Sequence, residues 1–141
     1  MADVRWRALL PALIISPLVP AAIGAGVLFL ASLTGGEAVA PTIIAAAAIY
    51  GAMLGAPTYL IFGGIAFWLT IRRARGNPRG FWFWALIANL ISAPFVLMFF
   101  MVLPGGDPFG PTGALIGFGC IFAPVWGGLF GMFHRWFGGL L

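Results

Sequence analysis

The middle of the chain reads RRARGNPRG over residues 72–80 and continues as FWFW over residues 81–84. This segment holds four of the seven Arg residues in a chain of 141 residues with a net charge of +4. Long apolar stretches without a single charged residue lie on both sides of it. We expect a bilayer to surround those stretches and the basic segment to be the loop that joins two pairs of them.

The composition supports a membrane environment for the whole chain. Charged residues make up 7% and apolar residues 62%, whereas soluble domains average about 25% and 45–50%. So few charged side chains cannot cover the surface of a water-soluble domain of this length. We therefore predict a single integral membrane domain, 1–141.

Four uncharged stretches are long enough to cross a bilayer, which takes about 20 helical residues. We expect helices because a span must satisfy its own backbone hydrogen bonds, and no stretch shows the alternating polarity of barrel strands. The predicted class is an all-α integral membrane protein with four transmembrane helices. Its first hairpin covers residues 8–71, its cytoplasmic basic loop 72–80 and its second hairpin 81–136. The spans lie within Ala8–Leu33, Thr42–Ile71, Phe81–Leu103 and Gly113–Phe133.

The N-terminal segment also resembles a signal peptide. Its apolar run is longer than the 7–15 residues of such a peptide, however, and Pro41 would follow the small-residue cleavage site. We therefore expect this segment to be retained as the first span.

The loop charges predict the orientation. Arg5 and Arg7 precede the first span, Arg135 follows the fourth, and the two remaining loops carry only Glu37 and Asp107. The positive-inside rule then places both termini and the basic loop in the cytoplasm. We expect a multi-pass protein of a bacterial cytoplasmic membrane, the cell inner membrane.

The basic loop has two compatible interpretations. Its arginines, which fix the topology, could also bind anionic lipid headgroups at about 1 kcal/mol each. Nucleic acid is not an expected partner, because no base-stacking face accompanies the charges. The residues concerned are Arg72, Arg73, Arg75 and Arg79.

The two outer loops resemble each other, which suggests an internal repeat. LTGGE at 33–37 is followed by PT at 41–42, and LPGGD at 103–107 is followed by PT at 111–112. Spans one and three also match, at an offset that makes span three about two turns shorter. Gly-Gly and Pro recur in many turns, but agreement in loop and helix favours a duplicated hairpin. Two tandem hairpins would insert with the same orientation, related by an axis along the membrane normal.

Small residues four positions apart allow membrane helices to approach closely. The second span carries such residues, and so does the fourth, whereas the third is bulky. We predict that spans two and four meet at the centre and that span three faces lipid or a partner. The packing residues are Gly51 and Gly55 in span two, and Gly113, Gly117, Gly127 and Gly131 in span four.

No ionisable residue lies inside a span, which argues against proton- or ion-coupled transport. Glu37 and Asp107 would form an outer acidic pair able to bind a cation or a basic partner, although surface carboxylates are usually only solvated. Asn89 has an amide to satisfy and could reach interfacial water. Trp126 and Asn89 could line a cleft, although packing between helices is the favoured role of Trp126, which is expected near the bilayer midplane. His134 could ligate haem or chlorophyll, but it has no companion ligand and fits the charged anchor better.

These residues do not form a catalytic constellation. We predict no enzyme activity, no cofactor and no metal. The favoured function is that of a non-catalytic membrane subunit or helix-packing interaction protein, which associates with a membrane-protein partner or with itself. The alternative is a small uncoupled transporter or pore for an apolar or weakly polar solute, built as a duplicated-hairpin bundle or a homodimer.

Overall fold

The computed structural model describes residues 5–35, 39–73, 80–103 and 107–139. Within them the chain forms only helices, and α2, η1 and α3 follow one another without a break. The result is four helical rods long and apolar enough to cross a membrane, as the sequence predicts. The elements are α1 (Trp6–Thr34), α2 (Val39–Thr58), the π-helical turn η1 (Tyr59–Gly63), α3 (Gly64–Arg73), α4 (Phe81–Val102) and α5 (Phe109–Gly139).

The helix lengths agree with the offset between the two halves of the sequence. α1 has 29 residues and α4 has 22, a difference of about two turns. Gly35, in the left-handed conformation at φ 61°, ends α1 and donates its N–H to Ala31 O. The internal repeat itself stays a prediction.

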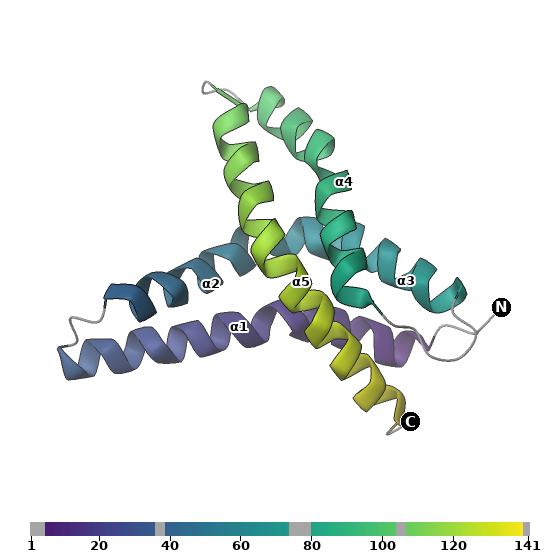
Figure 1. Ribbon diagram of the computed structural model, residues 1–141, viewed down its shortest axis with the longest axis horizontal. Helices are drawn as coiled ribbons and strands as arrows, with labels where there is room; N and C mark the ends of the chain where they lie inside the picture. The colour runs from purple at the N-terminus through teal and green to yellow at the C-terminus, as the bar shows by residue number, and fades with distance from the viewer. Residues whose placement is uncertain (1–4, 36–38, 74–79, 104–106, 140–141) are drawn as a thin grey trace.

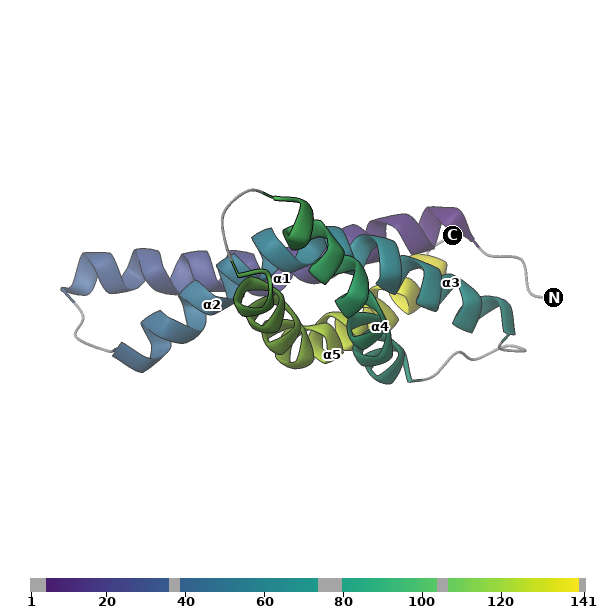
Figure 2. The ribbon, with the colours of Figure 1, turned by 90° about the horizontal axis from the view of Figure 1, so that it is seen from above.

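The helices pack in neighbouring pairs. α1 packs against α2, α4 packs against α5, and α5 also contacts α1 and α2. Both views of the ribbon place the start of α1, the end of α3 and the end of α5 on one side of the molecule (Figures 1 and 2). The end of α1 with the start of α2, and the end of α4 with the start of α5, lie away from that side and away from each other. The two helix pairs therefore meet at one end and diverge at the other.

The end where the two helix pairs meet carries the described arginines. Arg5 donates from its guanidinium to Gly138 O at 3.1 Å, which ties the start of the chain to its C-terminal helix. Arg135 donates from Nε to Gly131 O at 3.0 Å within α5. Arg7 lies in the first turn of α1, and Arg72 and Arg73 lie in the last turn of α3. We call this the arginine end.

The closest approach between helices occurs where α5 crosses the start of α4. A Cβ at Gly127 would lie 2.5 Å from Phe81 O and 2.8 Å from Ala85 Cβ, and one at Gly131 would lie 2.9 Å from the Phe81 ring. Gly24 has the same role between α1 and α2, since a Cβ there would lie 2.6 Å from Ala45 O. Without a hydrophobic drive between helices in lipid, such close contacts are what hold them together.

The predicted contact between spans two and four is present but is only part of the core. A Cβ at Gly51 would lie 3.0 Å from the Phe122 ring, and one at Gly55 would lie 3.0 Å from the Trp126 ring. Span three (α4) is expected to face lipid or a partner, but the contact between α4 and α5 is the most extensive of all the helix pairs. Small residues on one side of α4 make this possible, and the bulky residues point outward. The buried ones include Ala85, Ala88 and Ser92, and the exposed ones include Phe95, Met98, Phe99 and Met101.

The π-helical turn begins two residues after Pro57. Proline removes a hydrogen bond to the turn before it, and the widened turn comes immediately after this weakened segment. Gly64 N–H reaches back five residues to Tyr59 O, and Thr58 Oγ1 donates to Gly55 O at 2.9 Å. These bonds keep the backbone satisfied through the irregular turn.

The contact at Gly127 generates a direct prediction. Gly127→Ala is expected to lower the free energy of unfolding by about 1–3 kcal/mol, because two helices must separate to admit the methyl group. Gly128→Ala is the matched control, since a Cβ there has nothing within 4 Å. That variant is expected to be unchanged or slightly more stable, because Ala favours the helix. Thermal denaturation in detergent measures both, and equal stability of the two variants would contradict this packing.

Candidate functional site

A row of aromatic rings runs along α5 and passes through the centre of the molecule. The rings recur every four residues, so each lies beside the next on a ridge that winds slowly around the helix. Phe118 stacks on Phe122 and Phe122 on Trp126, with ring centroids 6.4 and 6.1 Å apart. Phe130 stacks on His134 at 5.5 Å. We call Phe118, Phe122, Trp126, Phe130 and His134 the aromatic row.

The second span contributes two rings that pack against this row. Tyr59, in the π-helical turn, meets Trp126 edge-on at 5.1 Å and Phe67 at 5.7 Å. Phe67 in turn stacks on Phe130 at 4.2 Å. The Tyr59 hydroxyl donates to Trp126 O at 3.2 Å. Edge-to-face pairs and a buried hydroxyl with a partner are the arrangements that make aromatic cores specific.

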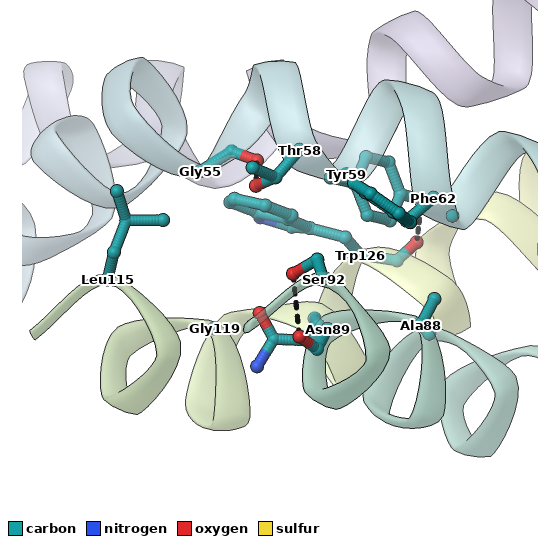
Figure 3. Close-up of a pocket in the computed structure, with 13 residues that line it drawn as sticks. Gly55, Thr58, Tyr59, Phe62, Ala88, Asn89, Ser92, Leu115, Gly119 and Trp126 are labelled. Carbon is teal, nitrogen blue, oxygen red and sulfur yellow. Dashed lines mark hydrogen bonds between the residues drawn. The ribbon is translucent and has the colours of Figure 1, made fainter. Parts of the chain in front are cut away.

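Trp126 borders a small cavity whose walls carry polar groups (Figure 3). The indole lies between Thr58 on one side and Ser92 with Asn89 on the other. The cavity volume is about 20 Å³, enough for one water molecule. Trp126 is 2% exposed, and its Nε1 is buried without a hydrogen-bond partner among the described residues. A water in this cavity would be the natural acceptor for that donor.

Asn89 joins α4 to α5. Its Nδ2 donates to Ile116 O at 3.1 Å and approaches Cys120 Sγ at 3.7 Å. The amide lies directly against Gly119, where a Cβ would overlap Asn89 Oδ1. The sequence leaves open whether Asn89 reaches interfacial water, and the structure instead gives its amide partners on the neighbouring helix. Asn89 and Trp126, both proposed to line a cleft, border the same cavity.

A second, larger cavity also borders Trp126 and lies between α2, α4 and α5. Its volume is about 180 Å³. Tyr50 and Leu54 line it from α2, Phe100 from α4, and Phe118 with Phe122 from α5. Its walls are almost wholly apolar. We call it the inter-hairpin cleft.

The predicted packing glycines fall into two groups. Gly51, Gly55, Gly127 and Gly131 face other helices. Gly113 and Gly117 do not, because a Cβ at either would have nothing within 4 Å. Their spacing alone predicts a contact within the chain, but they lie on the exposed side of α5, where the described residues supply no neighbour.

The predicted acidic pair is described only in part. Asp107 accepts hydrogen bonds from Phe109 N at 2.9 Å and Gly110 N at 3.2 Å, so it caps the start of α5. Glu37 lies outside the described residues, as do Arg75 and Arg79 of the basic loop. Arg72 places its guanidinium over the Trp68 ring, 4.8 Å from the centroid, whereas Arg73 borders a groove between α3 and α4.

His134 is half-buried beside the exposed Arg135. Its ring stacks on Phe130, and its Nε2 is buried with no partner among the described residues. Cys120 is an exposed free thiol. In the part of the chain that is described, no three His, Cys, Asp or Glu side chains gather as metal ligands would.

The aromatic row is the feature that sequence reasoning missed. Trp126 and His134 taken singly do not indicate the row, whereas the four-residue spacing that links them to three Phe residues predicts it.

Comparison with known protein families, with curated proteins and with solved structures finds no match for this chain.

The two tyrosines allow the central hydrogen bond to be tested. Tyr59→Phe is expected to lower the free energy of unfolding by about 0.5–1.5 kcal/mol, because it removes the hydroxyl that bonds Trp126 O. Tyr50→Phe is the control, since Tyr50 is 62% exposed, and it is expected to leave stability unchanged. Thermal unfolding in detergent measures both variants. A Tyr59→Phe protein as stable as the parent would show that this bond contributes nothing.

Proposed function

We propose that the chain is a non-catalytic multi-pass membrane protein that acts by packing against another transmembrane helix. The observation that carries the proposal is the outward position of Gly113 and Gly117 on α5. Paired glycines on a membrane helix let a second helix approach closely. Because none of the described helices occupies that position, the partner helix under this proposal comes from another molecule.

The surroundings of these glycines fit a docked helix. The inter-hairpin cleft lies beside them, and Ala114, Leu115 and Phe118 of the same half of α5 border it. The exposed bulky side chains of α4 supply a second apolar surface nearby. An apolar helix of a second copy, or of a different membrane protein, would fill both.

For the orientation we propose the arginine end as the cytoplasmic side of a bacterial inner membrane. The support is the gathering of the described arginines at one end of the helices, together with the positive-inside rule. Under this proposal both termini are cytoplasmic and the two hairpins are tandem units of the same orientation.

We propose no catalytic role, because the residues able to do chemistry lie far apart. Asp107 caps the start of α5, and His134 lies near its end among aromatic rings. General acid–base catalysis requires such groups within reach of one substrate.

An uncoupled transporter or pore is the second candidate. Polar groups of Thr58, Tyr59, Asn89 and Ser92 surround the cavity at Trp126 and would suit a weakly polar solute. Its volume of about 20 Å³ accepts no more than a water molecule. Transport would therefore need the hairpins to separate further.

The lone Cys120 reports on the proposed interface, because it is exposed on the same half of α5. Extracted from membranes in mild detergent, the protein is expected to run as an assembly larger than one chain. Gly117→Ile should weaken the assembly by at least about tenfold, or 1.4 kcal/mol, without lowering the stability of the single chain. If the partner is a second copy, a short bismaleimide should join Cys120 to Cys120.

Gly26→Ile on α1 is the control, since that glycine is also exposed and has nothing within 4 Å of a Cβ. This variant should assemble normally. A monomer that carries solute across liposomes would favour the transporter. If Gly117→Ile leaves the assembly unchanged, α5 does not form the interface.

A further inference from the structure

A groove of about 430 Å³ lies between α3 and α4. Ile65, Leu69, Ile87 and Ile91 line most of it with apolar surface. Arg73, Thr70 and Trp84 stand at one end, which is the arginine end because α3 finishes and α4 begins there. The groove is thus apolar along its length and cationic at its mouth.

We propose that this groove binds one acyl chain of an anionic phospholipid, whose phosphate is held by Arg73. The groove spans Phe62 to Arg73 along the second rod, which is about 16 Å of helix. One leaflet of hydrocarbon is about 15 Å deep. A chain in the groove therefore brings its headgroup to the level of the guanidinium.

The charges around the groove favour an anion at its mouth. Asp107, the one carboxylate of the described residues, caps α5 beyond the opposite end of α4. Arg72 is turned toward Trp68, and the neighbouring Arg73 is the arginine that lines the groove. Trp84 lines the groove at the same level, and tryptophans at the membrane interface commonly donate their indole N–H to polar partners there.

The site needs the chain to be in a membrane but does not depend on the partner helix proposed above. It is formed by α3 and α4, whereas the exposed glycines belong to α5. Failure of one proposal therefore leaves the other standing.

The test compares two adjacent arginines in the full-length protein. The purified chain is given equal amounts of phosphatidylglycerol and phosphatidylcholine with identical acyl chains, and retained lipid is counted by native mass spectrometry. The parent protein should retain phosphatidylglycerol preferentially. Arg73→Gln should reduce that preference about fivefold, and Arg72→Gln, which removes the same charge, should leave it within twofold.

Two further measurements separate the groove from surface charge. Ile65→Trp or Ile91→Trp places bulk in the groove at an exposed position and should lower lipid retention with no change in charge. Glycerol phosphate, which has no acyl chain, should not displace the lipid. Equal losses from the two Arg→Gln variants, unchanged retention in both Trp variants, or displacement by glycerol phosphate would each overturn the proposal.

Discussion

The close crossing of α5 over α4 is the contact on which the rest of the structure depends. Glycine at position 127 brings the backbone of α5 against Phe81 O, and this approach turns the aromatic row toward the second rod. Tyr59 and Phe67 then close around Trp126 and Phe130. In lipid, where apolar surface alone does not drive helices together, shape complementarity of this kind takes the place of a hydrophobic core.

The four rods could be predicted from the sequence because hydropathy and length decide which segments cross a bilayer. Which faces of those rods touch could not. Gly117 and Gly119 are both small residues of α5, yet only Gly119 meets a neighbour, the Asn89 amide. Which small residue meets a neighbour depends on the angle at which the helices cross. The residue spacing along one helix does not specify that angle. Asn89 and Trp126 were identified because a polar group and a tryptophan are unusual at such depth.

The polar side chains of the interior serve cohesion in this arrangement. The hydroxyl of Tyr59 and the amide of Asn89 each bond a carbonyl on α5, so each joins one helix to the next. Ser16 and Ser92 bond carbonyls of their own helices and add no link between rods. The interior is therefore held by a few directional bonds set among close-packed rings.

The extra residue of the π-helical turn changes which way the second rod faces along its length. An ordinary helix advances about 100° per residue, so one inserted position rotates everything beyond it by that amount. Before the turn α2 packs against α5 at Gly51 and Gly55; after it α3 packs mainly against α4, while Phe67 keeps a ring contact with Phe130 of α5. A single insertion thus lets one continuous span serve two different neighbours. Adding or deleting one residue between positions 58 and 64 would therefore rotate α3 relative to α2, so that the two could no longer keep their present contacts together.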